Sequence, residues 1–323
     1  MQTYFSHAIR DALAEEMERD PRVILIGEDI AEYGGAFKVT AGFAERFGKQ
    51  RVRNTPISEG GFTGVAVGAA LTGLRPVVEM MFADFVTLAL DQLVNHAAKF
   101  NYMYNGQVTV PLVMRLPSGA GRGYGPTHSG SMERYLYNTP GLRVVAPSDA
   151  ADAKGMLKAA IRCEEPVCFI ESKLLYGKRG EVPEGDYVVP LDQARVVREG
   201  DAVTIIAYSR MTGEALRAAG ALAERGVECA VVDLRSLAPL DVETLAASVR
   251  ATQRVVVVEE GSLTGGVGAE VVARVVESCF DYLEAPPLRV AAADTPIPAS
   301  PALERAGTPD AQRIAEAVLR LVS

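Results

Sequence analysis

Glu59 is the carboxylate whose surroundings most favour chemistry. It stands in ISEGGFTGVAVGAALTG, directly before a run made almost entirely of Gly, Ala and Val. Small residues let a helix pack close to another backbone, so a single carboxylate there should lose its water, which suits a group that gives or takes a proton near neutral pH. A helix N-terminal acid, stabilised by the helix dipole and following Ser58 as cap, explains the same residue about equally well. Local physics alone therefore leaves both interpretations open.

A glycine-rich loop contains the second candidate, His128. The run GAGRGYGPTHS at 119–129 follows an expected strand, and His128 is the only one of three histidines in such a setting. Glycines let a backbone approach a ligand closely, which favours a functional role over an exposed loop histidine. A second glycine turn, GSLTGGVGAE at 261–270, is followed by Val271 where a dinucleotide fingerprint has Gly or Ala. We therefore expect a tight turn there and no NAD site.

The elements that must position these residues follow an α/β pattern. Short apolar runs alternate with helical segments, which is typical of buried parallel strands and their crossover helices. In the first part of the chain we expect strands at 23–27, 51–54, 76–80, 110–115 and 167–171, and helices at 3–18, 60–73, 85–100 and 150–163. Glu28 directly follows the first strand, at the edge where open sheets bind ligands.

The pattern lapses between about 175 and 200. This segment is rich in Gly, Pro and charge, which predicts a linker with one hairpin at most. The alternation then restarts, with strands expected at 203–208, 228–234, 254–259 and 288–292, and helices at 213–225, 242–250, 268–280 and from 310. We expect two doubly wound α/β domains, a mainly parallel-sheet domain at 1–189 and a smaller one at 190–323.

Composition excludes several classes of function. The formal charge of −8 argues against a nucleic-acid or anionic-membrane partner. No apolar run is long enough to span a bilayer. The four cysteines form no CxxC pair and no HExxH occurs, so a zinc site is not expected. The first residues lack the basic start and apolar core of a signal peptide, and we expect a cytoplasmic location.

Several longer blocks resemble the beta chain of 2-oxoacid dehydrogenase decarboxylating components, of the pyruvate or acetoin dehydrogenase type. They are TPISEGGFTGVAVGAALTGLRPVVE at 55–79, FADF at 82–85, DQLVNHAAK at 91–99, PGLRVVAPSDAADAKG at 140–155 and LRSLAPLD at 234–241. The resemblance runs from end to end. It implies a transketolase-like pyrimidine-binding domain, then a transketolase C-terminal domain, and thiamine diphosphate as cofactor. It also implies two alpha chains paired with two beta chains, and a lipoyl-bearing acyltransferase as a further partner.

One motif of thiamine-diphosphate enzymes is missing. The Gly-Asp-Gly that holds the magnesium-bound diphosphate does not occur, since Asp186 is followed by Tyr187 and Asp201 by Ala202. In the family that this chain resembles, the alpha chain has this motif. The resemblance therefore implies that magnesium is held by the alpha subunit.

The resemblance also implies roles for single residues. Glu59 would bond the aminopyrimidine ring nitrogen and Phe85 would pack against that ring. Ile57 and Glu28 would line the same pocket. His128 would lie in the active-site channel and orient the intermediate or assist acyl transfer to lipoamide, although Gly130 replaces the usual Gln two residues later.

Two further sites follow from the resemblance alone. Asp294 matches a position that docks the acyltransferase. A structural potassium ion would bind at positions matching Leu112, Ala160, Ile161, Cys163 and Glu165.

The function expected is oxidative decarboxylation of a 2-oxo acid, with pyruvate first, or cleavage of acetoin. A branched-chain 2-oxo acid is an alternative substrate. The C-terminal half of a split transketolase-like enzyme is a second alternative, and a non-catalytic scaffold a third.

Overall fold

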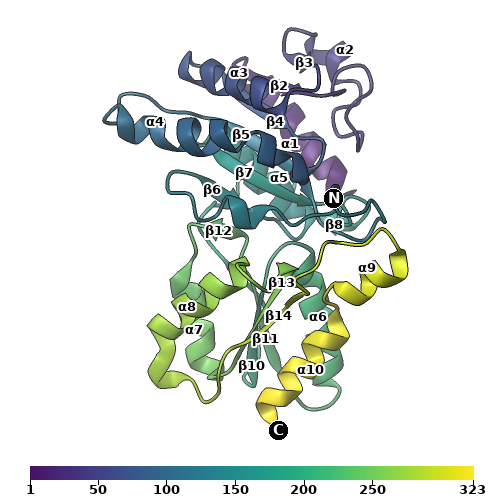
Figure 1. Cartoon of the computed structure of the whole chain (residues 1–323), viewed down its shortest axis with the longest axis vertical. Helices are drawn as coiled ribbons and strands as arrows, with labels where there is room; N and C mark the ends of the chain where they lie inside the picture. Colours follow the sequence, from purple (N-terminus) through teal and green to yellow (C-terminus); the bar gives the residue numbers. More distant parts are fainter.

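The computed structural model describes all 323 residues and contains two open sheets, one above the other in Figure 1. The upper sheet has the strand order β12-β6-β7-β5-β4-β2-β3, and the lower one has β14-β13-β10-β11-β9. Helices cover both faces of each sheet (Figure 1). The predicted fold class, two doubly wound α/β units, is confirmed.

The upper sheet is parallel except at one edge. Its strands are β2 (Val23–Gly27), β3 (Val52–Asn54), β4 (Arg75–Glu79), β5 (Val113–Ser118), β6 (Arg143–Val145), β7 (Val167–Ser172) and β12 (Ser236–Ala238). Only β12, which comes from the second half of the chain, pairs antiparallel. This strand ties the later part of the chain to the first sheet.

Side-chain alternation explains why the upper sheet has helices on both faces. Along β2, Ile24 and Ile26 belong to one apolar core, whereas Val23 and Leu25 belong to another. Successive side chains of a strand point to opposite faces, so an uninterrupted apolar run needs cover on both sides. The helices α1 (Phe5–Arg19) and α5 (Ala150–Arg162) cover one face, and α3 (Glu59–Leu71) with the segment after β4 covers the other.

The lower sheet has the same construction. Its strands are β9 (Arg195–Arg198), β10 (Val203–Ala207), β11 (Cys229–Asp233), β13 (Val255–Ser262) and β14 (Leu288–Ala292), of which only β9 is antiparallel. The helices α6 (Arg210–Ala223) and α10 (Ala311–Val322) pack together on one face, and α7 (Val242–Thr252) and α8 (Val267–Cys279) on the other. The core of α7 and α8 is continuous with that of α3, so the two halves share buried surface.

One local prediction was wrong, and some details were not foreseen. The helix expected at 85–100 is a 3-10 helix (η1, Ala83–Leu88), a π-helix (η2, Asp91–Ala97) and then α4 (Ala98–Met103). Over six or seven residues, apolar spacing cannot distinguish these helix types. The segment at 175–200 forms no hairpin of its own, which the expected linker allows, since β8 (Arg179–Glu181) pairs with β1 (Gln2–Tyr4) and β9 pairs with β11. The short helices α2 (Phe43–Phe47) and α9 (Pro301–Gly307) were not expected.

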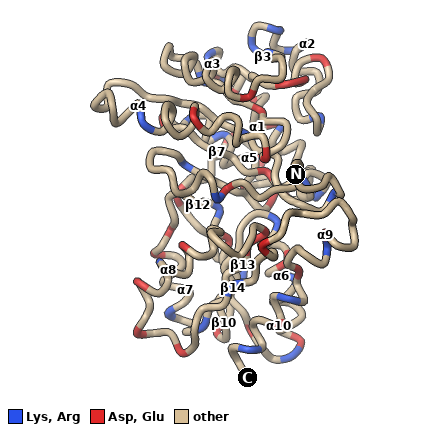
Figure 2. The backbone as a smooth tube through the Cα atoms, in the orientation of Figure 1, with Lys and Arg blue, Asp and Glu red and all other residues tan.

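Charged residues are distributed over both halves, with acidic and basic side chains interspersed (Figure 2). No helix combines the length and the apolar character needed to cross a membrane.

Candidate active site

Two carboxylates meet at the edge formed by the end of β2 and the start of α3. Glu28 directly follows β2 and Glu59 is the first residue of α3, and both are buried. Burial raises the pKa of Glu28, and the nearby negative charges of Glu59 and Asp29 raise it further. One oxygen of Glu28, Oε1, is buried without a hydrogen-bond partner. The pair therefore has a carboxyl group that readily keeps a proton and an oxygen free to bond a ligand.

The capping interpretation of Ser58 is wrong. Its side chain makes no cap bond to α3, and its hydroxyl donates to the carbonyl of Pro56 at 3.2 Å. Glu59 still lies in the first turn of α3.

The glycines of α3 bring it close to η1 and η2, as their size predicted. A Cβ on Gly60 would lie 2.9 Å from the carbonyl oxygen of Leu88, and one on Gly64 would lie 3.0 Å from the side chain of Gln92. Because real Cβ atoms do not come within 2.9 Å of a backbone oxygen, only glycine permits this packing at position 60, and a larger residue at position 64 would have to displace the Gln92 side chain. It sets Glu59 beside the segment that contains Phe85.

Phe85 and His128 belong to one aromatic cluster. The ring centroid of His128 lies 4.7 Å from that of Phe82 and 5.2 Å from that of Phe85, both edge-to-face. The hydroxyl of Thr127 lies 2.9 Å from Nδ1 of His128. The buried ammonium of Lys173 donates to the carbonyl of His128 at 2.6 Å. These contacts hold the imidazole from its ring faces, from one ring nitrogen and through the backbone.

A cavity of about 450 Å³ lies between the two halves next to this cluster. Its wall includes Phe85 and Thr127 from the first half and Glu260 and Ile297 from the second. Ile57 is different, because 84% of its surface is exposed. Within this chain it lines no closed pocket.

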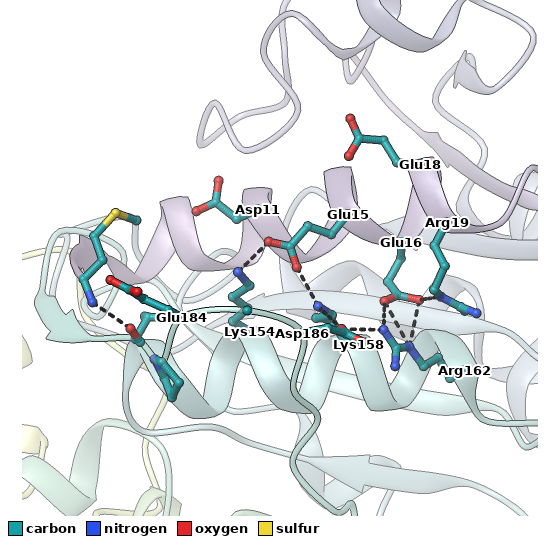
Figure 3. A pocket seen from close by; sticks show the side chains of 14 residues that line it. Asp11, Glu15, Glu16, Glu18, Arg19, Lys154, Lys158, Arg162, Glu184 and Asp186 are labelled. Atoms are coloured by element: carbon teal, nitrogen blue, oxygen red, sulfur yellow. Dashed lines mark hydrogen bonds and ion pairs between the residues drawn. The ribbon is translucent and has the colours of Figure 1, made fainter.

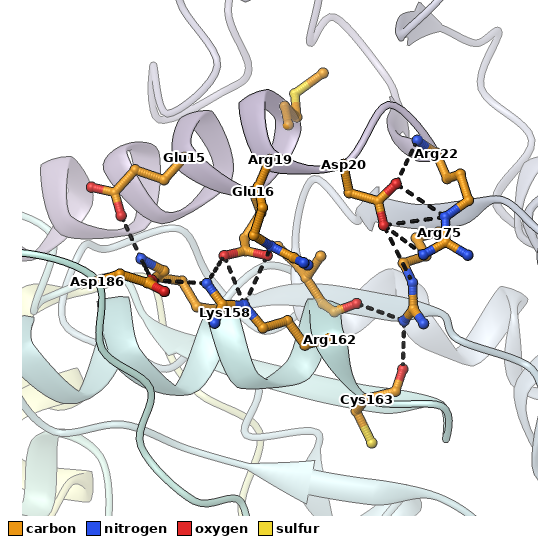
Figure 4. Close-up of polar contacts among 12 residues, drawn as sticks. Glu15, Glu16, Arg19, Asp20, Arg22, Arg75, Lys158, Arg162, Cys163 and Asp186 are labelled. Atoms are coloured by element: carbon orange, nitrogen blue, oxygen red, sulfur yellow. Dashed lines mark hydrogen bonds and ion pairs between the residues drawn. The ribbon is translucent and has the colours of Figure 1, made fainter.

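Two of the five residues predicted to hold potassium, Ile161 and Cys163, have carbonyls that face an arginine. Arg75 donates through Nη1 to the carbonyls of Ile161 (2.9 Å) and Cys163 (3.0 Å), as Figure 4 shows for Cys163, and it pairs with Glu164. The carbonyls of Leu112 and Ala160 accept the amides of Val167 and Cys163, and the Glu165 side chain bonds Arg143. A guanidinium already neutralises these carbonyl dipoles and would repel a second cation. As they stand, the five residues do not fit a potassium ion.

A second cavity, of about 750 Å³, contains none of the predicted site residues. It lies between α1 and α5 and is lined mainly by ion pairs, such as Glu15 with Lys154 and Lys158 at 2.5 Å each (Figure 3). No group of three or more His, Cys, Asp or Glu side chains is arranged to hold a metal ion. Asp294 is exposed and accepts from the amide and hydroxyl of Thr264 at 3.0 and 2.7 Å. The Thr264 hydroxyl and amide hold the pKa of the Asp294 carboxyl below its usual value.

Sequence reasoning missed the residues that hold the His128 loop. They are Asp84, Lys173, Glu260 and Glu304. Lys173 directly follows β7 and Glu260 lies near the end of β13, so the rule that ligand sites gather at carboxyl ends of strands would have flagged both. No local signal marks Glu304.

The chain has the domain composition of transketolase-type proteins. The family model described as "Transketolase, pyrimidine binding domain" matches residues 2–178, and "Transketolase, C-terminal domain" matches residues 192–314. A pyruvate dehydrogenase E1 component subunit beta-2, mitochondrial, of Oryza sativa subsp. japonica is 48% identical over 97% of this chain and 84% of its own length. The E1 component subunit beta of Rickettsia felis is 45% identical over 99% and 98%. The chain therefore belongs to the family of pyruvate dehydrogenase E1 beta subunits.

A solved structure is similar over the whole chain. It is described as a split gene transketolase, inactive beta4 tetramer. The TM-score is 0.81 at 28% identity, and the alignment covers 98% of each chain.

Proposed function

We propose that this chain, paired with an alpha chain, forms a thiamine-diphosphate-dependent enzyme that decarboxylates pyruvate and transfers the acetyl group to lipoamide of an acyltransferase. The observation that supports it best is the buried pair Glu28 and Glu59 beside η1. An unpartnered buried oxygen next to a second carboxyl fits a nitrogen-bearing ring such as an aminopyrimidine. When bound, thiamine diphosphate supplies the nucleophilic carbon and accepts the electrons released with carbon dioxide.

The residues of this chain have distinct proposed tasks. Glu59 shares a proton with the pyrimidine ring nitrogen, and Glu28 lines the same pocket. Phe85 packs against the ring. His128, which packs on the cavity-lining ring of Phe85, orients the intermediate or assists acyl transfer. Ile57, being exposed, contacts the cofactor only where another subunit closes the pocket.

An exposed apolar surface supports the alpha partner. Around α3, Ile57, Val65, Leu71 and Leu88 are exposed, between 38% and 84% of their surface. A run of exposed large apolar side chains is typical of a subunit interface. We propose that this surface binds the alpha chain, which also holds magnesium and the diphosphate, in an assembly of two alpha and two beta chains.

Two smaller assignments complete the proposal. The domain division falls at 189/190, in the segment between β8 and β9. Asp294 docks the acyltransferase, for which its exposed and firmly ionised carboxylate is suited.

The similarity to a split transketolase supports a second candidate, the C-terminal half of a sugar-transferring enzyme. Co-expression with an alpha chain followed by a substrate panel separates the candidates. The panel contains pyruvate, acetoin, a branched-chain 2-oxo acid and a ketose phosphate with an aldose acceptor. Lipoyl-domain acylation is the readout for the first three, and consumption of the ketose phosphate is the readout for the fourth. We expect pyruvate to react fastest. Turnover of the ketose phosphate alone would overturn the proposal, and preference for acetoin or the branched-chain acid would change its substrate.

A further inference from the structure

The glycine-rich loop before His128 is bonded to carboxylates through its backbone amides. The amide of Ala120 donates to Oε1 of Glu260 at 2.6 Å. The amides of Gly121 and Gly123 donate to the two oxygens of Glu304, at 2.7 and 3.0 Å. Three amides of one short segment thus point at two negative charges.

The glycine spacing of this loop is what makes these bonds available. Gly119, Gly121, Gly123 and Gly125 all have positive φ, between 70° and 100°. Positive φ at alternate residues turns amides toward one side, as in the anion-binding concavities called nests. A Cβ on Gly119 would lie 2.9 Å from Glu260, and one on Gly121 would overlap the side chain of Leu174. The loop therefore requires glycine to approach the carboxylates.

Both carboxylates come from the second half of the chain. Glu260 lies on β13 and its other oxygen accepts from Arg210 at 3.1 Å. Glu304 lies on α9 and is 3% exposed. A buried carboxylate needs strong hydrogen bonds, and for Glu304 the two glycine amides supply them.

The far end of the loop is anchored in the first half of the chain. The amide of Gly130 donates to Asp84 at 3.0 Å, and Lys173 donates to the carbonyl of His128. Within the loop, Tyr124 packs edge-to-face on Phe82, the same ring that contacts His128. The position of the imidazole is therefore determined from both halves of the molecule.

We propose that Glu304 and Glu260 are positioning residues, which hold the glycine-rich loop through its amides and thereby place His128 against Phe85, a residue that lines the cavity between the halves. The inference rests on the proposed function only for the task of His128. The loop contacts themselves are formed within this chain and do not depend on that function.

Hydrogen exchange on the full-length chain tests the contacts without cofactor or partner. Glutamine has a single side-chain oxygen. In Glu304→Gln, one of the amides of Gly121 and Gly123 therefore loses its acceptor, and the other donates to a neutral oxygen in place of a carboxylate. We expect exchange at 120–125 to rise by about tenfold or more, while strands β2 to β5 keep their protection. Glu316→Gln, an exposed acid on α10, is the matched control and should change nothing. Unchanged exchange at 120–125 in Glu304→Gln would overturn the proposal.

A second variant and a kinetic readout complete the test. If Glu304→Gln does not fold, Glu260→Ala, which removes the acceptor of the Ala120 amide, should release Ala120 in the same assay, and unchanged exchange there would overturn the proposal equally. In the assembled enzyme, Glu304→Gln should lower lipoyl-domain acylation more than reduction of an artificial electron acceptor. Equal losses in both assays would contradict the placement of His128. If the assembled wild type is inactive but exchange at 120–125 is faster in Glu304→Gln, the loop contacts stand and only the proposed function is contradicted.

Discussion

The imidazole of His128 meets the ring of Phe85 edge-to-face, with centroids 5.2 Å apart and planes at 80°. The contact joins the two segments that sequence analysis singled out separately, the FADF run and the glycine-rich loop. Since an edge-to-face pair contributes about 1 kcal/mol beyond its buried area, Phe85 helps to place the histidine as well as facing the proposed cofactor pocket.

Replacing Phe85 should therefore affect the histidine. We expect Phe85→Ala to lower the rate of lipoyl-domain acylation by roughly fivefold or more, and Phe85→Leu to lower it less because volume is kept. Stopped-flow acylation measures both. Phe280→Ala, at a 72% exposed ring in the second half, is the control. Equal rates for Phe85→Ala and wild type would show that the contact does not position His128.

Glu59→Gln tests the proposed proton-sharing carboxylate. Glutamine has nearly the same shape but cannot give up a proton, so decarboxylation by the assembled enzyme should fall about a hundredfold or more. Circular dichroism should show an unchanged fold. Glu18→Gln, at an exposed acid of α1, should keep full activity. A rate within a few-fold of wild type for Glu59→Gln would remove Glu59 from this role.

The buried carboxyl of Glu259 predicts a pH dependence of stability. Burial, and to a smaller degree Glu133, raises its pKa from 4.5 to about 7, although the amides of Gly268 and Val267 and the charge of Arg289 oppose the shift. Between pH 4.5 and 7 the folded chain keeps a proton that the unfolded chain releases, so stability falls as pH rises through this window.

Glu259→Gln should remove this dependence. We compare the free energy of unfolding of the variant minus that of wild type at two pH values. This difference should be larger at pH 8 than at pH 5 by on the order of 3 kcal/mol. Urea unfolding at the two pH values measures the difference. Asp233, whose pKa burial also raises to about 7, contributes equally to both proteins and cancels. The same stability difference at both pH values would contradict the prediction.

The centre of the upper sheet contains a buried ion network. Arg115, 1% exposed, donates to both oxygens of Glu171 at 2.7 and 2.8 Å and also pairs with Glu79. The hydroxyl of Tyr176 donates to Glu171 at 2.6 Å. Burial opposes the charge of Arg115, yet Glu171 and Glu79 hold its pKa above the usual value.

Breaking this network should be costly. Arg115→Met leaves the two buried carboxyl groups of Glu79 and Glu171 without a countercharge and should reduce the free energy of unfolding by about 3–5 kcal/mol. Glu270→Gln, which breaks the exposed pair with Arg274 at 2.8 Å, should cost only about 0.5 kcal/mol. Urea unfolding at constant pH compares the two, and similar losses would show that burial does not govern this network.

The exposed apolar surface around α3 predicts an assembly defect without a folding defect. Val65 is 65% exposed, so Val65→Asp should leave the melting temperature of the isolated chain within about 2 °C of wild type. The same change should abolish co-purification with the alpha chain, because a charge would be buried in the interface. Val188→Asp, at an exposed position in the segment that links β8 to β9, should still co-purify. Retained binding by Val65→Asp would move the interface elsewhere.

The sequence by itself determined what depends on neighbours along the chain. Runs such as Val23–Gly27 predicted strands buried on both faces, and the glycines after Glu59 predicted close helix packing. His128 was recognised from its glycine-rich loop. Each of these signals depends on residue types within a few positions, where backbone sterics and side-chain size act directly.

Only the tertiary structure decided the partners of these segments. Glu304 lies 183 residues from Gly121, and Arg75 lies 86 residues from Ile161. Nothing in the local sequence of Arg75 or Ile161 distinguishes a carbonyl that faces a guanidinium from one that could bind potassium. Such pairs form because packing of whole sheets and helices brings distant segments together. The burial that makes each contact strong exists only after that packing is complete.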